Sequence, residues 1–230
     1  MSSNLQWTPN RSTLQQHFRL LGAELWGHGE SPAPREPGRY RVDAYLSEFE
    51  AVRARLGIER WFVCGQSFGA GIAMRYALAN PQVVRGLIVT NSRSALNDVA
   101  AEAGSGGRFE AWQELDLRSL PYHPCHAQRF PVDLKAQMEA SADRIDAYAL
   151  WQAARTTARG LSCRAVASRI RVPTLLVNGR WEKAFQGDRD FAVATIPDLT
   201  VADLDAGHSV NIEASSDFDA AVIAFGARHA

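Results

Sequence analysis

The residues best suited to chemistry in this sequence form a short glycine-bounded run, GQSFG, at residues 65–69. The run fits the pattern G-x-S-x-G, in which a serine occupies a sharp turn between a strand and a helix. An apolar run, WFVC at 61–64, precedes it, and a helical pattern follows over 68–79. A hydroxyl in such a turn is exposed at the end of a sheet, where it can attack a carbonyl carbon. The motif therefore predicts that Ser67 is a nucleophile.

The neighbours of Ser67 have expected roles in this turn. Gly65 and Gly69 carry no side chains and should leave room for a strained backbone, and Gln66 completes the turn. The start of the following helix favours a developing negative charge, so the backbone N–H of Phe68 is a candidate donor to an oxyanion. The alternative is an ordinary serine in a glycine turn, but the strand before it and the helix after it favour the nucleophile.

A serine nucleophile needs a base, and the base needs an acid that orients it. His208 follows the last strand pattern, LTVADL, which places it at the same end of a sheet as Ser67. Glu182 lies just beyond the strand pattern PTLLV, at the same edge, and is the candidate acid. Asp188 and Asp190 are rival acids, but both fall in the helix that follows. The alternatives are a solvated loop histidine and a surface glutamate, and the chain order serine, acid, histidine favours the catalytic interpretation.

Strand and helix patterns alternate around these candidate residues. We expect strands at 18–25, 61–64, 85–90, 173–177 and 199–204, and helices at 43–56, 68–79, 185–196 and 213–227. This alternation predicts an α/β fold with a mostly parallel, doubly wound sheet. The stretch 94–169 lacks strand patterns and is expected to be a helical cap or lid insertion. Residues 1–93 and 170–230 would then form the core domain.

The composition of the 230-residue chain argues against several functional classes. Its 25 basic residues balance 25 acidic ones, so no long-range field attracts nucleic acid or anionic lipid. No apolar run reaches the roughly 18 residues of a membrane span, and no signal peptide is visible. Three scattered cysteines are too few for a disulfide framework. We therefore expect a cytoplasmic protein that acts on a small molecule, with no nucleic-acid or membrane partner.

Two histidine-bearing stretches are candidates for other kinds of site. The first, PYHPCH, contains His123, Cys125 and His126, but their spacing fits no standard zinc site. We expect neither a metal nor an organic cofactor. The second, LWGHGESP, has three interpretations: an anion-binding corner, a metal site or a tight turn. The glycines on either side of His28 favour the turn.

The chain resembles the α/β-hydrolase superfamily, in particular its serine esterases and lactonases. The resemblance rests on LWGHGESPAP, CGQSFGAG, VPTLLVNGRWE and LDAGHSVNIE, and it extends from about Trp7 to the C-terminus. It implies that Ser67 is the nucleophile, His208 the general base and Glu182 the orienting acid. A serine at this position argues against the dehalogenase and epoxide-hydrolase relatives, which need a carboxylate nucleophile. The middle of the chain resembles the family's cap, in which five aromatic residues would line a substrate pocket or form the core of the cap: Phe109, Trp112, Tyr122, Tyr148 and Trp151.

The sequence also departs from that family near its start. In the family, three strands and a His-Gly oxyanion loop come before the counterpart of the His28 turn. Few residues precede Phe18 here, so strands 1 to 3 and that loop are expected to be absent. The strands at 18–25 and 61–64 would then pair directly, or the missing part would come from elsewhere, or the sequence would be a truncation. The backbone N–H of Phe68 would remain as one oxyanion donor. An open sheet edge could pair with a second chain, which predicts a possible homodimer.

Together these residues predict a serine hydrolase that cleaves a small carboxylic ester, lactone or thioester through an acyl-enzyme on Ser67. A C–C bond hydrolase with the same triad is a variant of this prediction. The alternative is a non-catalytic binding protein, or an inactive truncated homologue, that keeps the fold and the pocket. The expected loss of the oxyanion loop motivates that alternative, because one missing donor typically costs about 10²–10³ in turnover.

Overall fold

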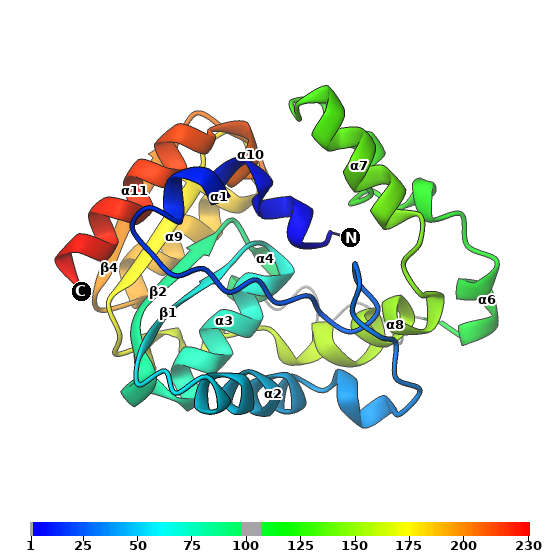
Figure 1. Ribbon diagram of the computed structural model, residues 1–230, viewed down its shortest axis with the longest axis horizontal. Helices are drawn as coiled ribbons and strands as arrows, with labels where there is room; N and C mark the ends of the chain where they lie inside the picture. Colours follow the sequence, from blue (N-terminus) through cyan, green and yellow to red (C-terminus); the bar gives the residue numbers. More distant parts are fainter. Residues whose placement is uncertain (1, 98–106) are drawn as a thin grey trace.

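A parallel sheet forms the centre of the molecule in the computed structural model, which describes residues 2–97 and 107–230 (Figure 1). In these residues the sheet has four strands: β1 (Trp61–Gly65), β2 (Val84–Thr90), β3 (Thr174–Gly179) and β4 (Leu199–Leu204). Strands that are neighbours in the chain are neighbours in the sheet, and all three pairs are parallel. The predicted α/β fold with a parallel sheet is therefore confirmed.

Helices connect the strands and flank the sheet. The α-helices are α1 (Thr8–Leu14), α2 (Val42–Arg55), α3 (Phe68–Ala79), α4 (Arg93–Leu96), α6 (Phe109–Gln113), α7 (Val132–Ala142), α8 (Ala147–Gln152), α9 (Gln186–Thr195), α10 (Val210–Glu213) and α11 (Ser215–Arg228). Short 3₁₀ helices span Asn4–Trp7, Pro37–Tyr40, Pro81–Val83, Leu117–Ser119, Pro124–His126, Ala158–Gly160, Arg164–Arg169 and Lys183–Phe185, and Ala153–Thr157 form a π-helical turn. No helix among the described residues is long and apolar enough to span a membrane.

The two faces of the sheet bury separate apolar cores. Leu87 and Leu176 point to the face covered by α3 and α9. Ile88 and Leu175 point to the opposite face, which α1 and α11 cover (Figure 1). Successive side chains of a strand alternate between faces, so the continuous apolar runs of β2 and β3 supply both cores. This two-sided burial fixes the carboxyl ends of the strands, where the candidate residues lie.

The expected strand at 18–25 is wrong. The backbone there is irregular, and Leu20 and Leu21 are exposed. Phe18 at its start contacts the core beside Phe62, with the two rings 6.0 Å apart, and Leu25 at its end packs against a separate apolar cluster. Apolar composition alone suggested a strand, but the segment has no ladder partner to satisfy its backbone.

Strand β1 is consequently an edge strand among the described residues. Most of its side chains are only half-buried, and Cys64 is exposed. The direct pairing of 18–25 with β1 does not occur. The predicted homodimer stays a prediction.

Most helix bounds agree with the sequence patterns, with two corrections. Helix α3 has the predicted bounds, and α2 ends where predicted, before Gly57, whose φ is +64°. Helix α2 begins at Val42, one residue earlier than predicted, and Asp43 in its first turn pairs with Arg41. The predicted last helix, 213–227, corresponds to α11, which begins at Ser215, and the short helix α10 before it was not predicted.

Residues 107–169, called here the helical segment, contain helices and loops but no strand. Helix α7 of this segment packs through Leu134 and Met138 against Leu5 and Ile212. Three of the five aromatic residues form one cluster with ring centroids 5.3 to 5.7 Å apart, as expected for a cap core: Phe109, Tyr148 and Trp151. Trp112 lies in α6, and Tyr122 is exposed. The division into a core and a cap at 94 and 169 stays a prediction, and residues 98–106 lie outside the described part.

Candidate active site

Ser67 has the strained backbone that its motif predicts. Its φ is 51° and its ψ is −114°, and it is the one non-glycine residue with positive φ among the described residues. It lies between the end of β1 and the start of α3. Non-glycine residues rarely adopt this conformation, and the strain is of order 1–3 kcal/mol. Such strain is typical of a side chain that is held in one place for function.

The two glycines of the turn have different roles. A Cβ on Gly65 would lie 2.3 Å from the backbone oxygen of Gly69, so the turn excludes a side chain at this position. A Cβ on Gly69 would meet no atom within 4 Å. The prediction that both glycines provide room is therefore correct for Gly65 and wrong for Gly69, because only the backbone of Gly69 lies against the turn.

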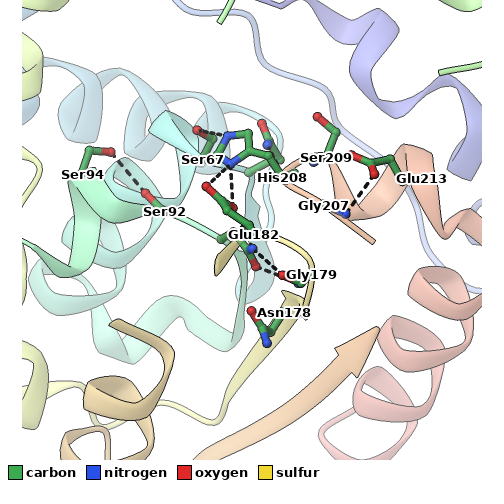
Figure 2. Close-up of polar contacts among 12 residues, drawn as sticks. Ser67, Ser92, Ser94, Asn178, Gly179, Glu182, Gly207, His208, Ser209 and Glu213 are labelled. Carbon is green, nitrogen blue, oxygen red and sulfur yellow. Dashed lines mark hydrogen bonds and ion pairs between the residues drawn. The ribbon is translucent and has the colours of Figure 1, made fainter. Parts of the chain in front are cut away.

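Ser67, His208 and Glu182 lie together at the carboxyl ends of the strands and form one hydrogen-bonded chain (Figure 2). The Nε2 atom of His208 is 2.8 Å from the Ser67 hydroxyl oxygen. Its Nδ1 atom is 3.0 Å from each carboxylate oxygen of Glu182. Because a carboxylate can only accept, Nδ1 carries a proton and Nε2 is free to accept the serine proton. The structure thus brings together all three predicted residues in the predicted order.

The environment keeps Glu182 ionised. Burial alone would raise the pKa of its carboxyl, but hydrogen bonds from His208 and Asn91 and the nearby charge of Arg93 outweigh this effect. The resulting pKa lies below the ordinary value for glutamate. The His208 side chain is 47% exposed, whereas that of Glu182 is 21% exposed. The acid is therefore shielded behind a histidine that remains accessible to a substrate.

Two side chains hold the backbone of the His208 loop. The Gln66 side-chain amide donates to the His208 carbonyl oxygen at 3.3 Å. The Glu213 carboxylate accepts the backbone N–H groups of Gly207 at 2.9 Å and Ser209 at 3.3 Å. Gln66 was expected only as part of the turn, and Glu213 was not predicted. A signal for Glu213 was its place on the first helical turn after the histidine.

Asn91 is a second residue that the sequence analysis missed. It directly follows β2, and its side-chain amide donates to a Glu182 carboxylate oxygen at 2.7 Å. Its place just beyond the carboxyl end of a central strand was the available signal, because Ser67 and Glu182 also follow strand ends.

The rival acids do not reach His208. Asp188 is buried beside α4, where it accepts a hydrogen bond from Asn97 at 3.2 Å and lies 3.6 Å from an Arg164 nitrogen. Asp190 is exposed and pairs with Arg189. Their positions in α9 direct both carboxylates away from the strand ends.

Phe68, the predicted donor to an oxyanion, directly follows Ser67. It is the first residue of α3, where backbone N–H groups have no acceptor inside the helix. Its role remains a prediction, as does the absence of a second donor from an N-terminal loop.

The stretch LWGHGESP is a tight turn, as its glycines predict. Gly27 and Gly29 have φ values of +76° and +56°, and the Gly27 N–H donates to the Pro32 carbonyl at 2.9 Å. The His28 ring bonds to the Trp26 carbonyl at 3.1 Å. Burial lowers the pKa of His28 to about 4, so its ring is neutral at pH 7.

The histidines of PYHPCH contact nearby backbone groups and one carboxylate, since His123 Nε2 lies 3.2 Å from an Asp143 oxygen. His123 accepts from the Cys125 N–H at 3.1 Å, and a His126 ring nitrogen lies 2.8 Å from the Arg118 carbonyl oxygen. Within residues 2–97 and 107–230, no group of three His, Cys, Asp or Glu side chains is arranged to hold a metal ion.

The family described as the alpha/beta hydrolase fold matches residues 1–215 of this chain. The chain belongs to the α/β-hydrolase fold family. Membership confirms the resemblance inferred from the four motifs and agrees with the parallel sheet. In an α/β hydrolase, the strand–turn–helix that carries Ser67 is the expected place for a nucleophile.

Relatives and solved structures place this α/β hydrolase among proteins of several activities. An uncharacterised protein of Mycobacterium tuberculosis is 36% identical over 93 residues, which are 40% of this chain and 27% of that protein. The match therefore spans about a quarter of that relative's length. A Stutzerimonas stutzeri protein, named provisionally as the carbamate hydrolase RutD, is 26% identical over 93% of this chain and 83% of its own length.

Two solved structures show how widely the fold is shared. The enol-lactonase from Burkholderia xenovorans has a TM-score of 0.82 at 20% identity, covering 98% of this chain and 87% of its own. An esterase from Exiguobacterium antarcticum has a TM-score of 0.82 at 18% identity, covering 97% of this chain and 87% of its own. At these identities the likeness concerns the fold alone.

Proposed function

We propose that this α/β hydrolase cleaves a small carboxylic ester, lactone or thioester through an acyl-enzyme on Ser67. The observation that carries the proposal is the position of His208, which bonds Ser67 through one ring nitrogen and Glu182 through the other. A neutral imidazole in this position can accept the serine proton, and the carboxylate stabilises the imidazolium that forms. A binding protein would need no such chain of hydrogen bonds.

The reaction follows from these roles. Ser67 Oγ bonds to the carbonyl carbon while its proton passes to His208 Nε2, and the oxyanion lies near the Phe68 N–H. The bond to the alcohol or thiol then breaks, and the leaving group takes the proton from His208. Water next attacks the acyl-enzyme and gives its proton to His208. The carboxylic acid departs and Ser67 regains its proton.

The names of similar proteins support hydrolysis at a carbonyl carbon, but they differ in the class of substrate. Neighbours in fold include a lactonase and an esterase, and one relative is named for carbamate hydrolysis. Each of these substrates presents a carbonyl carbon to a nucleophile. We place the ester, lactone and thioester first because their leaving groups need less protonation than an amine. A C–C bond would need the same triad together with a stabilised carbanion as the leaving group.

The test is release of p-nitrophenolate from p-nitrophenyl acetate by the wild type and two variants. We expect the wild type to release a burst of about one equivalent per enzyme, followed by slower turnover. Ser67→Ala should lose both phases, and Ser12→Ala, an exposed serine on α1, should retain them. Release by the wild type at the rate of Ser67→Ala would overturn the proposal and favour the non-catalytic binding protein.

A further inference from the structure

Asn91 is a fully buried side chain at the junction between the strand ends and the candidate triad. Its Nδ2 atom donates to Glu182 Oε2 at 2.7 Å and to the Gly179 carbonyl at 3.1 Å. Its Oδ1 atom accepts the Gly179 backbone N–H at 2.9 Å. Both hydrogens of the amide therefore have acceptors, and its oxygen has a donor.

These three bonds fix the orientation of the carboxamide. Rotating it by 180° would place its NH₂ group against the Gly179 N–H and its oxygen against the Glu182 carboxylate. Both new contacts would be repulsive in a buried site, where an unsatisfied polar group costs about 1–3 kcal/mol. The Gly179 N–H thus selects the orientation in which the amide donates to Glu182.

Gly179 is also where the loops of the acid and the histidine meet. A Cβ on Gly179 would lie 2.0 Å from the Gly207 carbonyl oxygen, so the two backbones are in direct contact. The Trp181 N–H donates to the Ala206 carbonyl at 2.9 Å, which joins the same two loops. Through Gly179, Asn91 holds the backbone of this junction as well as the carboxylate beside it.

We propose that Asn91 is a positioning residue that aligns the Glu182 carboxylate with His208 through its fixed carboxamide. The inference rests on the proposed function, because it assigns Asn91 a role in the reactivity of Ser67. By binding Oε2, Asn91 restricts rotation of the carboxylate, whose two oxygens then both stay 3.0 Å from His208 Nδ1. An apolar or charged side chain in its place would leave Glu182 free to turn away or would repel it.

The experiment compares the wild type with Asn91→Ser and Asn91→Asp. The readout is the rate of labelling by a fluorophosphonate probe between pH 5 and 9, since labelling requires Ser67 to be activated by neutral His208. In Asn91→Ser, we expect the plateau rate, which is the constant labelling rate reached at high pH, to fall about 10- to 100-fold. The reason is that a small misplacement of the Glu182 carboxylate and of His208 is costly in rate. In Asn91→Asp, we expect a similar loss and a shifted midpoint, because two carboxyl groups about 2.7 Å apart cannot both stay ionised and Glu182 would share a proton with the new side chain.

Asn10→Asp is the matched control. Asn10 is also a buried asparagine that donates to a carboxylate, Asp219 Oδ1, at 2.9 Å, but it belongs to α1 and bonds none of the triad side chains. The same substitution there should lower the thermal midpoint and leave the labelling rate and its pH midpoint unchanged. Thermal unfolding of each variant shows whether it is folded at the assay temperature.

The outcomes separate this inference from the proposed function. Labelling of both Asn91 variants at the wild-type rate overturns the inference alone. A lower rate with an unmoved midpoint in Asn91→Asp assigns Asn91 only a structural role and also overturns it. If Asn91→Asp does not fold, the plateau rate of Asn91→Ser decides. No labelling of the wild type at any pH overturns the proposed function itself.

Discussion

At the scale of single residues, the candidate site combines one strained residue with side chains that are all hydrogen-bonded. Ser67 keeps its left-handed backbone because β1 and α3 fix it from both sides. His208 has a partner at each ring nitrogen, and Glu182 accepts from both His208 and Asn91. Groups held in this way lose little freedom when a substrate binds, which is the condition for effective catalysis.

Replacement of the acid tests the roles within this chain of hydrogen bonds. We expect Glu182→Gln to lower kcat for p-nitrophenyl acetate by about 10³–10⁴-fold, because an amide neither fixes the imidazole tautomer nor stabilises the imidazolium. Asp188→Asn is the matched control, since Asp188 is buried in the next helix and bonds Asn97 rather than His208. Equal kcat values for Glu182→Gln and the wild type would show that Glu182 is not the acid.

At the scale of elements, the strand–turn–helix of β1 and α3 presents Ser67. The turn is possible because Gly65 has no side chain, and the backbone of Gly69 occupies the space that a side chain would need. Phe68, the candidate oxyanion donor, begins α3 directly after the serine. The geometry of the site is thus a property of one compact turn and two loops that follow β3 and β4.

The two glycines of this turn should respond differently to alanine. Gly65→Ala should reduce both stability, by about 1–3 kcal/mol, and labelling of Ser67, because the new methyl group overlaps the Gly69 carbonyl. Gly69→Ala should fold and label as the wild type does, since its methyl group would meet no atom within 4 Å. The check is urea unfolding together with fluorophosphonate labelling. Equal losses in the two variants would contradict this account of the turn.

The same elements show what could be predicted from sequence. Strands β2 and β3 were predictable because buried parallel strands are continuous apolar runs. Strands β1 and β4 are only partly buried, and they were predictable as short apolar stretches that turns and helices follow. The run at 18–25 has similar composition but no partner strand, and pairing cannot be deduced from one segment. Asn91 was missed for a related reason: its importance comes from the backbone of Gly179, which only the folded chain brings near. Glu213 was missed although the backbone groups it accepts lie only four and six residues before it.

At the scale of the whole molecule, the helical segment is joined to the loops that carry His208 and Glu182. Arg129 lies 3.6 Å from the Glu213 carboxylate and stacks over the Trp181 ring at 4.4 Å. Helix α7 packs beside this contact on Leu5 and Ile212. The contacts of Arg129 and of α7 involve residues close in sequence to Glu182 or His208. Movement of the helical segment would therefore displace the loops that carry the candidate triad.

The apolar contact of α7 should dominate this attachment. Met138 is 3% exposed, and Met138→Ala should lower the free energy of unfolding by about 2–3 kcal/mol, because it removes buried methylene groups and leaves a cavity. Val132 lies on the same helix but is 83% exposed, so Val132→Ala should change stability by less than about 0.5 kcal/mol. Urea unfolding measures both. A Met138→Ala variant as stable as Val132→Ala would mean that α7 is not held by this contact.

The central claim is that His208 and Glu182 activate Ser67 as a nucleophile. It is tested most directly by mass spectrometry of the native protein after reaction with one equivalent of a fluorophosphonate, followed by peptide mapping. The account predicts a single adduct on Ser67, formed rapidly by the wild type, absent in Ser67→Ala and strongly slowed in His208→Ala. An unmodified wild-type protein, or an adduct on another residue with Ser67 unmodified, would contradict it.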